Sequence, residues 1–341
     1  MGTIGYVMRR AIVLVPLVLI LVLITFTMTT LIPVNPVEVL FAGNQDATPE
    51  MKAALRHELG LDLPFLERFS HYVVGLFRGD MGLSFFTRQP VSFEIASRIR
   101  ATLELAVFSF VLMLAIGIPI GVICATKRNS VTDFVLRIFS LGGVSMSSFW
   151  VGLILQLVFY SSLRILPLGG RVSSFVPVYV PITSITGFYT IDSLITGNLL
   201  AFSDVLKHLI LPGITLSYAG ISSLMRITRS SMLDVLNQDY VRTARASGFP
   251  ERVVTYIYAL KNALIPVITV LGLQFGRLIE GSVLIETIFD WPGLGFFMVR
   301  SILNLDYPSV IGVSLVICIM FVLVNLLVDV VYTFVDPRIK M

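Results

Sequence analysis

The chain has 341 residues, of which 56% are hydrophobic and only 13% are charged, and its mean hydropathy is +0.89. These values lie far outside the range of soluble domains and predict a membrane protein. The formal net charge of +4 does not indicate nucleic-acid binding, because the basic residues are scattered between apolar stretches and form no single patch.

The first apolar stretch, Ala11 to Leu31, follows Arg9 and Arg10 and contains no charged residue. A bilayer core about 30 Å thick needs about 20 apolar residues of helix, and this stretch meets that length. It is too long for a signal-peptide core and lacks a small-residue cleavage site. We therefore expect an uncleaved transmembrane helix within residues 1–32.

A long segment with charges of both signs, residues 33–100, follows this helix. Thr48-Pro49-Glu50 has the composition of a helix cap and first turn, and apolar residues recur near helical spacing from Leu55 to Phe69. We expect a small, partly helical extracytoplasmic subdomain. His57 and His71 lie in it without a Cys or His partner at ligand spacing, so no metal site is predicted.

Further apolar stretches bring the predicted number of transmembrane helices to six. They are Leu105 to Thr126, Ile138 to Leu163, His208 to Met225, Asn262 to Glu286 and Tyr307 to Val328. Cys124 and Cys318, the only cysteines, lie inside these stretches and are expected to be packing residues without a disulfide.

The short loops define the orientation, because cytoplasmic loops are rich in Lys and Arg. Their basic residues precede the first span, follow the second, lie between the fourth and fifth, and follow the sixth. They are Arg9, Arg10, Lys127, Arg128, Arg226, Arg229, Arg242, Arg245, Arg252, Lys261, Arg338 and Lys340. All fall on one side of a six-span topology, so we predict that both termini, including the tail 336–341, are cytoplasmic.

A second outer loop, Arg164 to Lys207, is rich in Pro, Gly, Ser and Thr. Its β-branched residues permit short strands without requiring them. His208, which follows this loop, is expected to mark the end of a helix.

The loop between the fourth and fifth spans, Arg226 to Lys261, is charged but too ordered in pattern for a linker. One apolar stripe runs from Met232 to Val241 and a second from Val253 to Leu260, on either side of Gly248-Phe249-Pro250. We predict two amphipathic helices joined by a glycine turn.

With this spacing the loop resembles the EAA-type loop of the membrane subunits of binding-protein-dependent ABC importers. Leu233 precedes Arg242 by nine residues, Arg242-Thr243-Ala244 fills the EAA positions, Gly248 follows after three residues, and Leu260-Lys261 closes the pattern. Arg242 replaces the Glu for which the motif is named, and Lys261 replaces a common Pro. The peptide-type branch of the family tolerates both departures.

Three other regions carry a resemblance to the dipeptide, oligopeptide and nickel permease branch, to the first of its two paralogous permeases. They are Ala101-Thr102-Leu103-Glu104-Leu105, the stretch from Glu286 to Gly295, and the end of the chain, where Asn325-Leu326-Leu327-Val328-Asp329 precedes Asp336-Pro337-Arg338. The resemblance implies an all-α membrane protein whose type I ABC importer domain covers residues 101–335, with the coupling loop at 226–262.

The resemblance also implies the partners: a paralogous second permease, two ABC ATPase subunits that hold ATP and Mg, and an extracytoplasmic substrate-binding protein, all acting at the bacterial inner membrane. The chain has no Gly-Lys dipeptide and hence no Walker-type phosphate loop. We therefore expect a pore subunit that is not itself an enzyme, binds no cofactor and moves di- or oligopeptides. Nickel, glutathione or another small solute are alternative cargoes.

The residues expected to couple the permease to its ATPases are Arg242, Thr243, Ala244, Arg245 and Gly248. Small Thr243 and Ala244 let a helix enter a groove closely, Gly248 supplies the turn, and the two arginines can reach acidic or carbonyl partners. The alternative is a basic loop that lies on anionic lipid.

Ionisable residues in or beside the spans are candidates for the translocation path or for an interface, because their burial in lipid is costly. They are Glu104, Arg277, Glu280, Glu286 and Asp329. Arg277 and Glu280 lie one helical turn apart, so an ion pair between them is the structural alternative. Glu104 can instead bond a helix N-terminus, and Glu286 and Asp329 can reach the membrane surface.

Two other classes of function compete with the importer. An ion-coupled secondary transporter needs inverted repeats and an ion site, and Arg277 with Glu280 is the only feature that favours it. An intramembrane hydrolase needs a nucleophile and a base inside the bilayer, and no histidine lies deep enough in the sequence to be that base.

Overall fold

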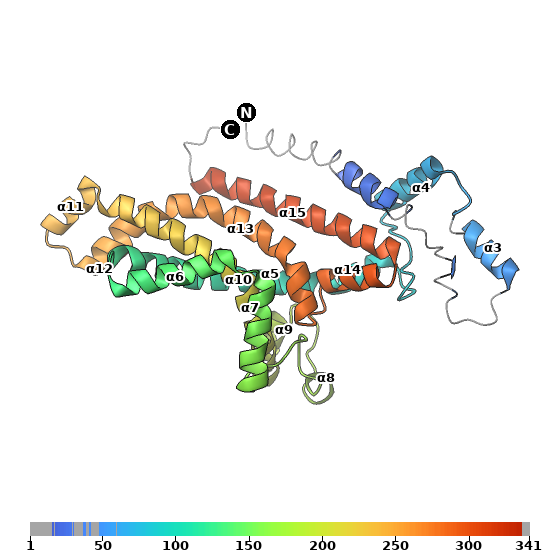
Figure 1. Ribbon diagram of the computed structural model, residues 1–341, viewed down its shortest axis with the longest axis horizontal. Coiled ribbons are helices and arrows are strands. Elements are labelled where there is room, and N and C mark those ends of the chain that lie inside the picture. Colours follow the sequence, from blue (N-terminus) through green and yellow to red (C-terminus); the bar gives the residue numbers. More distant parts are fainter. Residues whose placement is uncertain are drawn as a thin grey trace.

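The computed structural model describes residues 16, 18–28, 30, 37, 38, 41, 48–58 and 60–335. Within these residues the fold is helical, and the one β-contact is an isolated bridge between Leu83 and Pro90. Long helices run side by side along the longest axis of the molecule, and one helical arm projects from the middle of this bundle (Figure 1).

Among the described residues, four helices are long and apolar enough to cross a membrane: α5 (Val91–Thr126), α10 (Leu199–Leu236), the continuous helical stretch Glu251–Ile288, and Tyr307–Val328 within α15 (Tyr307–Val335). Each contains one of the predicted spans, but α5 and α10 begin well before them. These two helices have 36 and 38 residues, so at 1.5 Å per residue they extend beyond a bilayer core. His208 lies inside α10 and does not mark a helix end, which corrects the prediction.

The third predicted span, Ile138 to Leu163, is not one straight helix. It is divided into α6 (Val131–Ser145), α7 (Ser148–Leu155) and the π-helix η1 (Gln156–Ser162), and the two parts are bent by 109°. Met146 and Ser147 take extended backbone conformations at the break. Serines 145, 147 and 148 favour caps and turns over helix interiors, which explains the break. The arm in Figure 1 is this α7–η1 part.

The bundle core lies between α5, α10 and α13 (Leu260–Ile288), where Leu105, Leu209 and Ile285 are fully buried. Glycine allows the helices to approach closely: a Cβ at Gly121 of α5 would lie 2.6 Å from Cβ of Thr228 on α10. Small residues at such contacts are typical of membrane helix packing.

The segment after the first span contains α3 (Pro49–Glu58) and α4 (Phe65–Phe77). The hydroxyl of Thr48 accepts a hydrogen bond from the Met51 N–H at 3.3 Å, which confirms the predicted helix cap. In the first span, the structure describes a helix at Val18–Met28. The centroid of its Phe26 ring lies 5.6 Å from the ring centroids of Phe65 and Phe69 of α4.

The second outer loop contains two short helices, α8 (Val176–Tyr179) and α9 (Tyr189–Ile195), and the structure assigns no strand to it. Beyond α13, a tight turn leads to α14 (Leu294–Leu303) and then α15. In Figure 1, α14 lies at the end of the bundle opposite to α11 and α12.

Candidate coupling site and outer network

The predicted coupling residues lie on a small helical unit at one end of the bundle. α11 (Asp239–Ala246) follows α10, and after a turn α12 (Glu251–Val253) and the π-helix η2 (Val254–Ala259) lead into α13. This end also holds the connection between α5 and α6 (Figure 1). The helix is interrupted at Asn237 and Gln238, between α10 and α11. The first predicted apolar stripe, Met232 to Val241, is therefore shared between the end of α10 and α11.

Three buried side chains anchor the unit: Val241 and Ala244 on α11 pack against Val254. Gly248 ends α11 with φ of +81°, a conformation that favours glycine, and its N–H donates to the Arg245 carbonyl at 3.0 Å. Pro250 is the N-cap residue of α12. Proline is tolerated at the start of a helix, because a backbone N–H there would have no acceptor within the helix. The predicted glycine turn is confirmed.

The opposite face of α11 is exposed and polar. Arg242 and Arg245 lie on it with Thr243, and 70% of the Arg242 side chain is exposed. Arg245 forms an ion pair with Glu251 at 2.7 Å, which joins α11 to α12 across the turn. Arg242 lies 3.5 Å from exposed Asp239, a pair that contributes little to stability. The unit therefore presents exposed arginines with carboxylate neighbours on a well-anchored helix.

Glu104 is buried on α5 and holds the second outer loop. Its carboxylate pairs with Arg171 at 2.6 Å and accepts hydrogen bonds from the Thr190 N–H and hydroxyl at 2.7 and 2.8 Å. Thr190 lies in the first turn of α9, so the helix-terminus alternative for Glu104 is confirmed. Arg171 also stacks on the Tyr189 ring at 3.6 Å.

Glu286 is fully buried inside the protein. One carboxylate oxygen accepts hydrogen bonds from the Gly295 and Phe296 N–H groups at the start of α14, at 2.6 and 3.1 Å. Trp291 is also fully buried, and its indole N–H donates to the Ala101 carbonyl at 2.8 Å. This hydrogen bond ties the α13–α14 turn to α5.

Arg277 and Glu280 are both exposed on α13, and no ion pair joins them or links either one to another described residue. The expected pair between them is not formed. Glu280 lines a pocket of about 420 Å³ with Leu21 and Cys318.

The side chain of Asp329 lies outside the described residues. His57 and His71 take part in no metal-ligand group, since none exists among the described residues.

Sequence reasoning missed several buried acidic residues. Asp133 accepts two hydrogen bonds from the Arg229 guanidinium at 2.9 Å each, across 96 residues of sequence. Asp306 accepts from the Ser84 hydroxyl at 2.5 Å and from the Phe85 N–H at 2.9 Å. Asp192 accepts from the N–H groups of the 185–187 turn. The sequence offered one signal for Asp133: it is the only acidic residue in the otherwise largely apolar α6.

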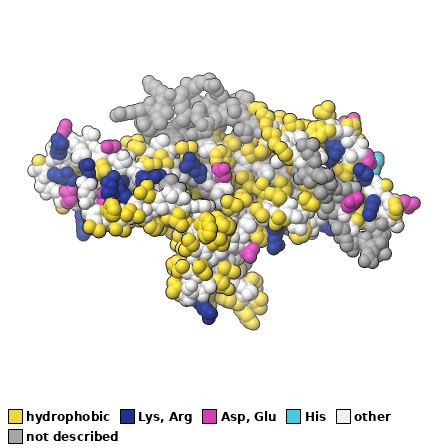
Figure 2. All heavy atoms as spheres, viewed as in Figure 1, with side chains coloured by type: hydrophobic (Ala, Val, Ile, Leu, Met, Phe, Trp, Pro, Cys, Tyr) yellow, Lys and Arg dark blue, Asp and Glu magenta, His cyan; other side chains and the backbone are white. Residues whose placement is uncertain are grey.

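Charged and hydrophobic side chains gather on different parts of the molecular surface. In Figure 2 the Lys and Arg side chains gather at the end formed by α11 and α12, whereas hydrophobic side chains cover the middle of the bundle and the α7–η1 arm. The arm carries large apolar side chains on its surface; for example, Trp150 and Leu157 are each 62% exposed. A surface of this kind suits a lipid bilayer or a second membrane subunit.

Comparison with known proteins covers nearly the whole chain. Residues 117–341 match the family described as binding-protein-dependent transport system inner membrane component, and residues 3–106 match the N-terminal family of the same membrane components. A probable D,D-dipeptide transport system permease, DdpB of Escherichia coli K12, is 46% identical over 93% of this chain and 92% of its own.

Two other relatives span almost the full length. The dipeptide transport system permease DppB of Escherichia coli K12 is 42% identical over 98% of both chains. The glutathione transport system permease GsiC of Salmonella choleraesuis is 37% identical over 98% of this chain and 99% of its own. The chain therefore belongs to the family of inner membrane components of binding-protein-dependent transport systems.

Proposed function

We propose that the chain is one of two pore-forming subunits of an ABC importer that carries di- or oligopeptides across the bacterial inner membrane. The observation that carries the proposal is the exposed, arginine-bearing face of α11, which Val241 and Ala244 anchor to the rest of the molecule. A rigid unit of this kind transmits force when a partner binds it, because its buried anchors resist separate movement.

The proposed coupling residues are Arg242, Thr243, Ala244, Arg245 and Gly248. Arg242 and Thr243 face the ATPase, Arg245 holds α12 in place through Glu251, and Gly248 sets the turn. Two partner ATPases hold ATP and Mg and dimerise when ATP binds. Their closure moves α11, and α10 and α13, which flank the unit, change the access of the pore.

The membrane arrangement belongs to the same proposal. Six spans cross the bilayer: the first helix, α5, the bent α6–α7 pair, α10, α13 and α15. The α11 end faces the cytoplasm together with both termini, because the short connections at this end are basic. The opposite end, with the subdomain of residues 33–100 and the second outer loop, receives the substrate-binding protein, and a paralogous permease completes the pore.

Peptides are the proposed cargo because relatives at 42–46% identity carry dipeptide names, whereas the glutathione permease is 37% identical. Glu104 and Glu286 are assigned structural roles, since each binds a helix N-terminus. Arg277 and Glu280 are the proposed pathway or subunit-interface residues, because they are exposed on a span without a partner among the described residues.

The experiment measures ATP-driven uptake of a labelled dipeptide into proteoliposomes that contain this chain with its co-encoded permease, ATPases and binding protein. The test variant is Gly248→Pro, and the matched control is Gly197→Pro in the outer loop. Both glycines have positive φ and open surroundings, and both N–H groups donate at about the same distance, 3.0 and 3.1 Å. Proline forbids that φ and removes the donor.

We expect Gly248→Pro to abolish uptake or ATPase association while the Gly197→Pro complex still assembles with its ATPases. Uptake without ATP, driven by an ion gradient, would establish the secondary transporter. Equal activity of the Gly248→Pro and wild-type complexes would show that the loop is only a lipid-facing basic segment. Competition by glutathione or nickel, but not by dipeptides, would reassign the cargo.

A further inference from the structure

A pocket of about 360 Å³ lies between α6 and α10, near the end of the bundle that carries α11. Its lining is of two kinds. Apolar walls come from Phe134, Ile138 and Leu141 on α6 and from Met225 on α10, and three arginines, Arg137, Arg226 and Arg229, contribute the charge. Neither the coupling segment nor the outer network uses this pocket.

The charges in the pocket are not balanced by the described residues around it. Asp133, which is fully buried, pairs with Arg229 at 2.9 Å and more weakly with Arg137 at 3.6 Å. Arg226 is exposed and has no partner among the described residues. Three guanidiniums against one carboxylate leave two positive charges beside an apolar surface, and such a surface favours an anionic occupant.

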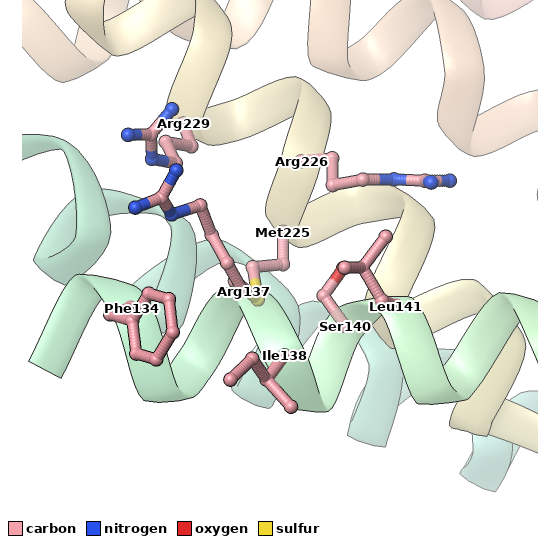
Figure 3. A pocket seen from close by; sticks show the side chains of 8 residues that line it. All are labelled: Phe134, Arg137, Ile138, Ser140, Leu141, Met225, Arg226 and Arg229. Atoms are coloured by element: carbon pink, nitrogen blue, oxygen red, sulfur yellow. The ribbon is translucent and has the colours of Figure 1, made fainter.

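The arginines stand at different places around the pocket. In Figure 3, the Arg137 and Arg229 guanidiniums lie near each other at one side, whereas Arg226 extends toward the opposite side. Asp133 fixes Arg229 through two hydrogen bonds, so this side of the pocket is preorganised. Arg137 and Arg229 can therefore hold an anionic group, and Arg226, which extends away from them, adds positive charge at the other side of the pocket.

The apolar side of the pocket continues along α6. Phe134, Ile138 and Leu141 are spaced four and three residues apart, so they share one face of the helix, and they are 57%, 54% and 60% exposed. An exposed apolar track of this kind has the width and chemistry to hold an acyl chain. A free inorganic anion has no apolar part that could contact these side chains.

The depth of the pocket in the membrane agrees with the chemistry. α6 begins at Val131, directly after the basic connection that contains Lys127 and Arg128. Arg137 is six residues further, about 9 Å along the helix axis, which places it near the boundary between headgroups and acyl chains. Long arginine side chains reach from this depth to the headgroup region.

We propose that this pocket binds one anionic phospholipid of the cytoplasmic leaflet. The phosphate lies at Arg137 and Arg229, Arg226 adds positive charge at the opposite side of the pocket, and an acyl chain follows Phe134, Ile138 and Leu141. A basic pocket between membrane helices on the cytoplasmic side is a known form of lipid headgroup recognition. The inference uses the proposed orientation of the chain but neither its cargo nor its coupling mechanism.

The test is a lipid titration of the assembled transporter complex, purified in mild detergent and followed by native mass spectrometry without ATP or peptide. Phosphatidylglycerol is compared with phosphatidylcholine of the same chains and with inorganic phosphate. The variants are Arg226→Gln and Arg137→Gln, neither of which removes the main Asp133 partner. Arg128→Gln, an exposed arginine of the nearby connection, is the control with the same charge change.

We expect wild type and Arg128→Gln to bind phosphatidylglycerol first, with each pocket variant losing about five-fold or more in affinity, since a basic residue near anionic lipid contributes about that factor. Equal affinity of all variants overturns the proposal, and so does equal binding of phosphatidylcholine. Displacement of the lipid by inorganic phosphate would define a phosphate site instead. Loss of the paralogous permease from the Arg226→Gln complex, with unchanged lipid binding, would assign the pocket to a subunit contact. Each result is independent of peptide uptake.

Discussion

The Glu104–Arg171 pair offers the sharpest test of how the outer loop is held. The Glu104 side chain is 2% exposed and that of Arg171 is 9% exposed, so water screens neither charge well. Changing Glu104 to Gln keeps an acceptor for Thr190 but leaves the Arg171 guanidinium buried without its carboxylate. Removing one partner of a buried pair costs about 3–5 kcal/mol.

This cost falls on the attachment of the loop to α5, because Glu104 and Arg171 belong to these two parts. The free-energy difference corresponds to an increase of about 150-fold or more in the open fraction of the loop. Limited proteolysis of right-side-out membrane vesicles measures that fraction when opening is fast relative to cleavage. We expect cleavage between residues 164 and 198 to accelerate by about two orders of magnitude in Glu104→Gln.

Two controls separate the buried charge from other effects of the substitution. Glu251→Gln removes a carboxylate from an exposed pair at the other end of the molecule, so it should leave outer-loop cleavage unchanged. Adding Arg171→Met to Glu104→Gln should restore most of the protection, because the unpaired charge is then gone. Cleavage of Glu104→Gln at the wild-type rate would refute this reasoning.

Three further predictions concern other parts of the fold. In Gly293→Ala the new Cβ would lie 2.5 Å from the Glu286 carboxyl carbon, so overpacking should destabilise the chain by about 1–3 kcal/mol and lower the Tm of the purified complex. Val241→Ala removes two carbons from a fully buried anchor and should reduce transport-linked ATP hydrolysis several-fold, whereas Ile257→Ala, at an exposed position of η2, should not loosen the anchor. Burial tends to raise the pKa of Asp192, but hydrogen bonds from Thr186 and from backbone N–H groups outweigh it and hold the pKa below 3.8. Because this folded-state pKa is depressed, the stabilisation is present above about pH 4 and is lost as pH falls further, so the protection factors for hydrogen exchange at residues 185–192, which correct for the intrinsic pH dependence of exchange, should fall there.

Each of these outcomes has a clear opposite. An unchanged Tm in Gly293→Ala would mean that Glu286 is not fixed against the turn. Equal coupling losses in Val241→Ala and Ile257→Ala would show that burial does not anchor α11. Protection factors at residues 185–192 that are independent of pH between about 2.5 and 6 in wild type would remove the proposed role of the Asp192 carboxylate.

The local features of this fold could be predicted from the sequence because their signals are local. The Thr48 cap and the Gly248 turn each depend on residues within a few positions, and the structure confirms both. The apolar stretches also placed four long helices, since bilayer thickness fixes the length that a span needs.

The remaining features depend on contacts between distant residues, which a single sequence does not reveal. The ion pair between Asp133 and Arg229 joins positions 96 residues apart. Glu286 was a candidate for the translocation path or an interface, with the membrane surface as the alternative. It is buried, because the turn that follows it folds back and brings the α14 N-terminus to its carboxylate. The break in the third span was missed for another reason: hydropathy averages over a few serines that end a helix.

The measurement that tests the central claim most directly is photo-crosslinking within the assembled complex. A photoreactive amino acid replaces exposed Thr243 on α11, and a control replaces Tyr179 in the second outer loop, where 80% of the side chain is exposed. The account predicts that position 243 forms an adduct with an ATPase subunit and that position 179 does not. Full peptide uptake by the position 243 variant without any ATPase adduct would contradict it.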